Sequence, residues 1–254
     1  MDPEALAQSF GAVAEQYARY RPMTPPEALD WLVPAGVVDV LDLAAGTGAL
    51  TQPLAALPLA VTAVEPDASM RAVLARVVPD ATVLAGHAES IPCDDAGFDA
   101  VYVASAWHWL EPAVAVPEIA RVLRDGGLLG VLGTTLDRDI PWVGGLPEVD
   151  EVAEAEHPPR DVVAVPAGAP FDAPETTDLR WVRPMTIDMF MGLLGTYSGA
   201  IVATPHDREH YLERSMAYLD EVPRAAGSGE LAVPMRTWMW RARRHPRGHQ
   251  PREA

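Results

Sequence analysis

The sequence VVDVLDLAAGTGALTQPLA, residues 37–55, decides the fold. Its first seven residues are apolar apart from two aspartates, which is typical of a short strand covered on both faces. Gly46, Thr47 and Gly48 then predict a tight turn, and the residues after them predict a helix. A glycine turn at a helix N-terminus offers backbone N–H groups and a partial positive charge. We therefore expect a nucleotide-like ligand at the carboxyl end of this strand.

The same alternation of strand and helix continues along the chain. Four more strands are predicted, at residues 59–66, 81–86, 98–105 and 128–136. Strands and helices that alternate at this period form right-handed units and a parallel sheet with helices on both faces. The expected fold class is therefore α/β: a Rossmann-like doubly wound sheet, mainly parallel with an antiparallel edge strand, plus a helical lid elaboration.

The pattern changes after residue 136, and this sets the expected domain boundaries. The following residues mix prolines and glycines with helical segments that are dense in aromatic and methionine side chains, as in a lid over an apolar substrate. The N-terminal helices and the core are expected in residues 1–136, and the substrate-covering elaboration in residues 137–232. A final sheet strand and a basic tail are expected in residues 233–254.

Three nucleotide chemistries use a glycine turn, and the residues around it distinguish them. A phosphate-binding loop needs a lysine after its glycines, and this chain contains no lysine. A dinucleotide fingerprint needs a third glycine, and Thr51 occupies that position. Glu65 ends the second predicted strand, 19 residues after Gly46, where a carboxylate can accept hydrogen bonds from ribose hydroxyls. We therefore expect a ribose-containing ligand.

Composition excludes several other classes of function. The formal net charge is -17, which disfavours nucleic-acid binding. No run approaches the ~20 apolar residues that span a bilayer, and the N-terminus lacks a signal-peptide pattern, so we expect a cytoplasmic protein with no membrane partner. The single cysteine, Cys93, excludes a disulfide framework within the chain. No histidine and carboxylate pattern indicates a metal site.

Two further stretches, with the segment that follows them, match one family. They are GHAESIP at residues 86–92 and VASAWHWLEP at residues 103–112, and IARVLRDGGLLGVLG follows. With the glycine turn, they resemble the class I S-adenosylmethionine-dependent methyltransferases of the small-molecule, methyltransferase type 11-like kind. The resemblance covers roughly residues 10–135, and Ala44 stands where this family commonly has a glycine. It implies S-adenosyl-L-methionine as the cofactor.

The resemblance also implies roles for individual residues. Asp42, Ala44 and Gly46 would line the methionine and ribose parts of the cofactor, and Glu65 would hold the ribose diol. The other implied cofactor contacts are Tyr17, Arg21, Pro66, Met70, His87, Ala88, Glu89, Ser105 and Ala106.

These further contacts divide by the part of the cofactor that each would touch. Pro66 and Met70 would pack near the adenine, and the segment that begins at His87 would read the adenine edge. Ser105 and Ala106 would lie beside the methionine end. The segment that holds Tyr17 and Arg21 would fold over the cofactor, and Arg21 could pair with its amino-acid carboxylate.

The acceptor side is predicted from fewer residues. His108 follows the fourth strand, and a histidine there can deprotonate an acceptor or donate a hydrogen bond to it. Tyr197, a second catalytic candidate, and Ser198 lie in GTYSGA, which resembles a segment that faces the substrate in this family. Trp107 and Trp142 are further substrate-binding candidates.

The sequence leaves three functions open. The first is methyl transfer to an O, N or C nucleophile of a small molecule, in secondary metabolism for example. The second is a methyltransferase fold that catalyses a non-methylating step such as a cyclisation. The third is a non-catalytic binding module. A nicotinamide dehydrogenase is disfavoured by the incomplete dinucleotide fingerprint. We expect a monomer or a homodimer.

Overall fold

The computed structural model describes residues 11–149, 165–166, 168–224 and 229–246. Within them the chain forms two compact units. The larger unit comprises Met23–Gly133, Val163–Thr177 and Trp238–Ala254, and the smaller unit comprises Met1–Pro22, Thr134–Val162 and Asp178–Thr237. Residues 37–55 lie in the larger unit.

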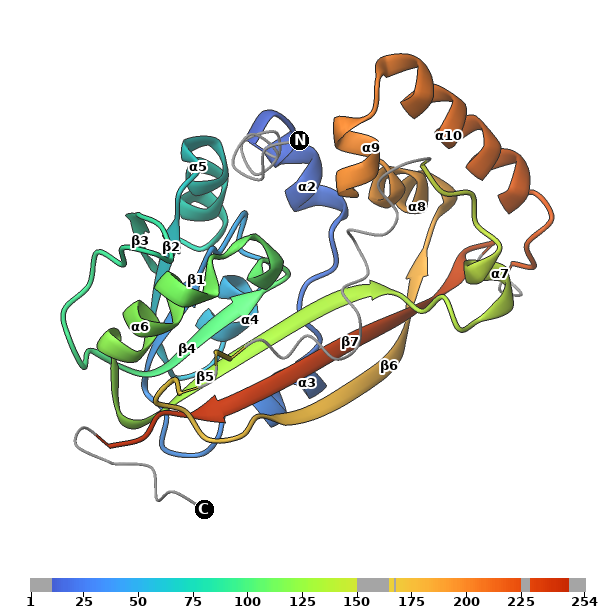
Figure 1. Cartoon of the computed structure of the whole chain (residues 1–254). Coiled ribbons are helices and arrows are strands. Elements are labelled where there is room, and N and C mark those ends of the chain that lie inside the picture. The colour runs from blue at the N-terminus through green and yellow to red at the C-terminus, as the bar shows by residue number, and fades with distance from the viewer. Residues whose placement is uncertain (1–10, 150–164, 167, 225–228, 247–254) are drawn as a thin grey trace. The chain divides into compact units, whose positions relative to one another are not determined.

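The strands form one seven-stranded sheet in the order β3-β2-β1-β4-β5-β7-β6 (Figure 1). They are β1 (Asp39–Leu43), β2 (Ala60–Glu65), β3 (Thr82–Ala85), β4 (Phe98–Ala104), β5 (Leu123–Leu136), β6 (Glu175–Met185) and β7 (Leu231–Arg243). The first five pair in parallel. The predicted Rossmann-like, mainly parallel sheet is therefore confirmed.

The antiparallel strand is β7. The Gly126 N–H donates to the Arg244 carbonyl and the Asp137 N–H to the Pro234 carbonyl, so residue numbers rise along β5 as they fall along β7. Figure 1 shows β7 between β5 and β6, with its arrow reversed. The last strand of the chain thus lies one position inside the edge, and β6 forms the edge itself.

The larger unit contains the strands and helices predicted around the glycine turn. Its helices are α3 (Pro26–Leu32), α4 (Thr51–Ala55), α5 (Ala68–Val77), the short 3₁₀ helix η2 (Trp107–Trp109) and α6 (Pro112–Val122). Leu41 and Leu43 of β1 are completely buried, in a cluster with Val101 and Val103 of β4. This burial explains the apolar run that opens at residue 37.

One helix ends earlier than its sequence suggests. The apolar pattern that starts at Pro112 predicts a helix that continues to the glycine pair at residues 126–127, yet α6 ends at Val122. Leu123 is extended, with φ -73° and ψ 144°, and pairs with Phe98 of β4. Pairing in the sheet therefore ends the helix before the glycines do.

The smaller unit is mainly helical. Its helices are η1 (Gly11–Val13), α2 (Ala14–Tyr20), α7 (Pro141–Gly144), α8 (Ile187–Leu194), α9 (Ser198–Val202) and α10 (Pro205–Leu219). Thr186 and Thr204 cap α8 and α10 by accepting from the N–H groups of Met189 and Asp207. The sequence of residues 137–161 also predicts an acidic helical piece, and residues 150–161 lie outside the described residues.

Close packing of α2 on α8 depends on a glycine. A Cβ at Gly192 would clash with the Tyr20 ring, so a larger residue there would force that ring to move. Met185 and Phe190 are fully buried in the core of this unit. Among the described helices, none combines the length and the apolar character needed to cross a membrane.

Candidate functional site

Three residues of the turn after β1 have a left-handed backbone conformation. Ala44, Gly46 and Gly48 have φ values of 56°, 58° and 97°. The two glycines have different surroundings: a Cβ at Gly48 would come within 2.7 Å of the Leu74 side chain, whereas a Cβ at Gly46 would meet nothing within 4 Å. Gly48 therefore allows the turn to pack against α5, and Gly46 leaves open space beside the backbone.

Glu65 is tied to this turn. Its Oε2 accepts from the Gly46 N–H at 2.8 Å, and its Oε1 accepts from the Asp67 N–H at 2.9 Å. The carboxylate is buried, and burial raises its pKa while the two N–H bonds oppose that shift. Each carboxylate oxygen can accept a second hydrogen bond, so a diol could still be bound there.

Asp42 carries an unsatisfied oxygen. The side chain is completely buried, and the Thr51 hydroxyl donates to Oδ2 at 2.6 Å. Oδ1 has no hydrogen-bond partner. Burial raises the pKa of Asp42 to about 7, against the lowering effect of the Thr51 bond. A buried acceptor without a donor is uncommon, and a bound donor or cation would satisfy it.

Thr51 was not predicted as a site residue. Its position excludes a dinucleotide fingerprint, but its hydroxyl is the group that holds Asp42. A threonine at the first turn of the helix after the glycines is the signal that could have identified it, since a hydroxyl there lies close to the preceding strand end.

The residues predicted near the adenine lie in or next to the first turn of α5 and in the segment after β3. Met70 is buried and Pro66 exposed, and Asp67 caps α5 by accepting from the Met70 N–H at 2.8 Å. His87 is exposed, and its carbonyl accepts from the Ser90 N–H.

The next two residues of that segment, Ala88 and Glu89, contact the rest of the larger unit. Ala88 is buried. Oε1 of Glu89 accepts from the Glu111 N–H at 3.1 Å, which links the segment to the start of α6.

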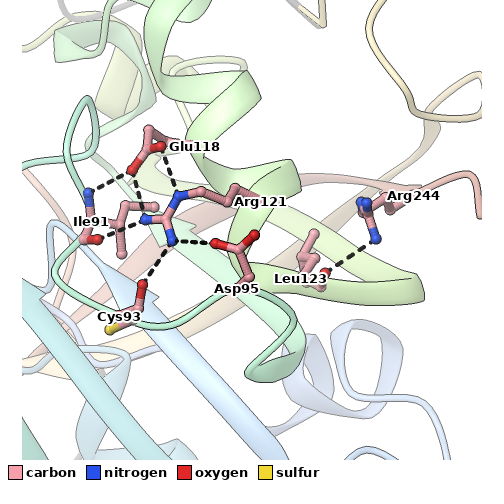
Figure 2. Close-up of polar contacts among 7 residues, drawn as sticks. All are labelled: Ile91, Cys93, Asp95, Glu118, Arg121, Leu123 and Arg244. Atoms are coloured by element: carbon pink, nitrogen blue, oxygen red, sulfur yellow. Dashed lines mark hydrogen bonds and ion pairs between the residues drawn. The ribbon is translucent and has the colours of Figure 1, made fainter. Parts of the chain in front are cut away.

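An arginine fixes the loop that follows this segment (Figure 2). Arg121 donates to the carbonyls of Ile91 and Cys93, both at 2.8 Å, and pairs with Asp95 at 3.0 Å. Glu118 accepts from the Ile91 N–H and from Arg121, and these bonds lower its pKa. The same figure shows Arg244 donating to the Leu123 carbonyl. Residues 91–95 are thus fastened to α6.

The segment after β4 contains both buried and exposed candidates. Ser105 is exposed with φ 54°, and its N–H donates to the Leu132 carbonyl at 2.7 Å. Ala106 is buried. His108 is exposed, and its ring lies 4.5 Å from the Trp109 ring.

Trp107 is part of the core of the larger unit. It is buried, and its ring meets Trp240 edge to face at 5.0 Å. The indole Nε1 of each tryptophan is buried without a hydrogen-bond acceptor. Core packing accounts for the position of Trp107, and its predicted contact with the substrate stays a prediction.

Three candidates meet within the smaller unit. The Arg21 guanidinium carbon lies 5.0 Å from the Tyr17 ring centroid and 4.4 Å from that of Tyr197. Arg21 Nη2 also donates to the Thr196 carbonyl at 2.7 Å. Stacking on aromatic rings fixes the plane of a guanidinium while leaving its edge available to donate. The family resemblance predicts that Tyr17 and Arg21 contact the cofactor and that Tyr197 acts in catalysis.

The other two candidates of this unit are Trp142 and Ser198. Trp142 packs against Phe190, with ring centroids 5.9 Å apart, and its carbonyl accepts from the Tyr218 hydroxyl. Ser198 is buried at the start of α9. In the described part of the chain, no group of three His, Cys, Asp or Glu side chains could hold a metal ion.

Comparison with known proteins matches the glycine turn and the strands after it to one family model. That model is described as a methyltransferase domain, and it matches residues 41–131. An uncharacterized methyltransferase of Mycobacterium tuberculosis is 41% identical over 93% of this chain and 96% of its own length. Demethylmenaquinone methyltransferase of Renibacterium salmoninarum is 40% identical, over 36% of this chain and 39% of its own.

Solved structures agree with the fold. A structure described as a type II methyltransferase from Anaeromyxobacter dehalogenans has a TM-score of 0.60 and 26% identity, over 89% of this chain and 99% of that one. A SAM-dependent methyltransferase from Thermotoga maritima has a TM-score of 0.53 and 20% identity, over 94% of this chain and 98% of that one.

Proposed function

Because this chain belongs to the class I S-adenosylmethionine-dependent methyltransferases, we propose that it transfers a methyl group from S-adenosyl-L-methionine to an O, N or C nucleophile of a small-molecule acceptor. Within that proposal, the acceptor class rests on the sequence resemblance and on the net charge of -17, which disfavours a nucleic-acid acceptor.

The observation that carries the proposal is the pair of buried carboxylates at the glycine turn. Asp42 Oδ1 lacks a partner, and the space beside Gly46 is open. Glu65 is held by two N–H groups and retains acceptor capacity. A ribose diol and an ammonium group are the donors that such acceptors suit. These residues therefore fit the cofactor: Glu65 would hold the ribose, and Asp42 would accept from the methionine part.

The chemistry divides between cofactor and protein. S-adenosylmethionine supplies an activated methyl group on a sulfonium, and the protein supplies binding and orientation. The chain must align the acceptor nucleophile and exclude water. A base is needed only where the nucleophile loses a proton. His108 and Tyr197 are the proposed side chains for that proton.

Ligand-induced stabilisation tests this function. A ligand at ~100 times its dissociation constant adds ~2.7 kcal/mol to the free energy of unfolding. We expect the melting temperature to rise by several degrees with S-adenosylmethionine and with S-adenosylhomocysteine, and to stay unchanged with NAD. Glu65→Gln should weaken S-adenosylhomocysteine binding at least ~10-fold, because one charge-assisted bond to the ribose is lost. Glu27→Gln, at an exposed position of α3, is the control. A rise with NAD alone would refute the proposal.

A further inference from the structure

A second arginine lies close to the stacked Arg21. Arg183, on β6, is half-buried, and its Nη1 donates to the Tyr20 carbonyl at 3.0 Å. Tyr20 directly precedes Arg21 in the chain, and Arg21 stacks on the Tyr197 ring. The Arg183 guanidinium is therefore held against the backbone of the residue that precedes Arg21.

Neither guanidinium is neutralised. Among the residues that the structure describes, no carboxylate pairs with Arg21 or Arg183, and Arg21 Nε is buried with no hydrogen-bond partner. Other arginines of the same unit form ion pairs with carboxylates. On β6 itself, Arg180 pairs with Asp137 and Asp139.

This exception has a physical cost. Burial of Arg183 lowers the pKa of its guanidinium, because a charge has been removed from water without a compensating anion. A chain with 36 acidic residues against 19 basic ones has many carboxylates that could have filled this position. An exogenous anion would remove this cost.

We propose that Arg183 binds a carboxylate group of the methyl acceptor. This inference rests on the proposed function and specifies the class of its substrate. The Arg183 guanidinium has five N–H donors in a planar fork, and one of its nitrogens donates to the Tyr20 carbonyl. The remaining N–H groups can donate to the two oxygens of a carboxylate. Trp181 lies two positions before Arg183 on the same face of β6, and its aromatic side chain suits an apolar body on the acceptor.

The carboxylate would be an anchor and not the methylated group. Hydrogen bonds from guanidinium groups withdraw electron density from carboxylate oxygens and make them weaker nucleophiles. The reacting O, N or C atom therefore lies elsewhere in the acceptor. Such an anchor fixes the orientation of the acceptor before methyl transfer.

Binding of matched charged and uncharged probes tests the inference. Benzoate, phenylacetate, cinnamate and hexanoate, each paired with its primary amide, are titrated into the full-length protein saturated with S-adenosylhomocysteine. At least one carboxylate should bind more tightly than its amide. Arg183→Gln should lower the affinity for that carboxylate at least ~10-fold, because a charge-assisted hydrogen bond is lost. The affinity for the matching amide should stay unchanged. Arg183→Lys should retain part of the affinity for the carboxylate. Arg180→Gln, an exposed position of the same strand, should bind as the wild type does.

The contrary outcomes are distinct. If every carboxylate binds no better than its amide, or if Arg183→Gln binds the carboxylate as the wild type does, the inference is wrong. If Arg183→Gln instead loses affinity for S-adenosylhomocysteine alone, the anion belongs to the cofactor and the inference is also wrong. Failure of the wild type to bind S-adenosylhomocysteine would refute the proposed function itself. The comparison within the wild type needs no variant to fold.

Discussion

At the scale of single residues, Asp42 is the most perturbed group of the candidate site. Its carboxyl is completely buried and its pKa is raised from 3.8 to about 7, chiefly by burial. The folded protein therefore holds this proton more tightly than the unfolded chain does. The contribution of Asp42 to stability is fully present below pH 3.8 and is lost as the pH rises towards 7.

Asp42→Asn should remove this pH dependence. The free energy of unfolding of the variant, relative to the wild type, should increase between pH 4 and pH 7 by up to ~1.4 kcal/mol per pH unit. Urea denaturation of both proteins at several pH values measures the difference. A constant difference across that range would show that Asp42 is ionised in the folded state well below pH 7.

Ala44 should gain stability when it becomes glycine. Its φ of 56° is a left-handed conformation that costs an L-residue ~1–2 kcal/mol. Glycine removes that cost but adds entropy to the unfolded chain, so Ala44→Gly should be stabilising by up to ~1 kcal/mol. Ala72→Gly, at an exposed position within α5, is the matched control and should destabilise by ~1 kcal/mol. Denaturation measures the free energy of unfolding of both variants. If both are destabilised equally, Ala44 carries no backbone strain.

At the scale of elements, the turn connects β1 to α4 and packs against α5, and its two glycines should respond differently to alanine. Gly48→Ala should lower the free energy of unfolding by more than ~2 kcal/mol, because strain at φ 97° is added to a contact of 2.7 Å with Leu74. Gly46→Ala should cost only the strain, ~1–2 kcal/mol, because no protein atom opposes its Cβ.

Ligand binding should rank the same two variants in the opposite order. The cofactor is proposed to lie in the open space beside Gly46. Gly46→Ala should therefore lower the affinity for S-adenosylhomocysteine more than Gly48→Ala does. Calorimetry on the folded variants measures this. Equal affinity in the wild type and Gly46→Ala would exclude a ligand from that space.

The elements also show what local sequence can predict. Strands β1 to β5 follow from apolar runs, and they were predicted. The early end of α6 was not, because it depends on pairing between Leu123 and Phe98, 25 residues away. The position of β7 inside the edge likewise depends on partners that no local pattern specifies.

The candidate site divides in the same way. Glu65 was predicted because its distance from the glycines is characteristic, and the structure ties it to Gly46. Thr51 and Arg183 were not predicted, because their roles depend on contacts with residues that are distant in sequence. Thr51 donates to a carboxylate nine positions earlier, and Arg183 donates to a carbonyl 163 positions earlier.

At the scale of the whole molecule, the dominant property is excess negative charge. The chain has 36 acidic and 19 basic residues, and several of its ion pairs are partly exposed. Exposed pairs contribute ~0–1 kcal/mol each and weaken with salt. Self-repulsion at a net charge of -17 is also screened by salt, over a Debye length of ~10 Å at 0.1 M. These two effects oppose each other.

Repulsion should dominate, because acids outnumber the basic partners available to them. We expect the melting temperature at pH 7 to rise as NaCl increases from ~10 mM to ~0.5 M, where the Debye length falls below the spacing of most surface charges. Differential scanning fluorimetry measures the rise. A parallel series at pH 5, where partial protonation reduces the net negative charge, should show a smaller rise. A melting temperature that falls with salt at pH 7 would mean that the ion pairs, and not the excess charge, control the stability of this protein.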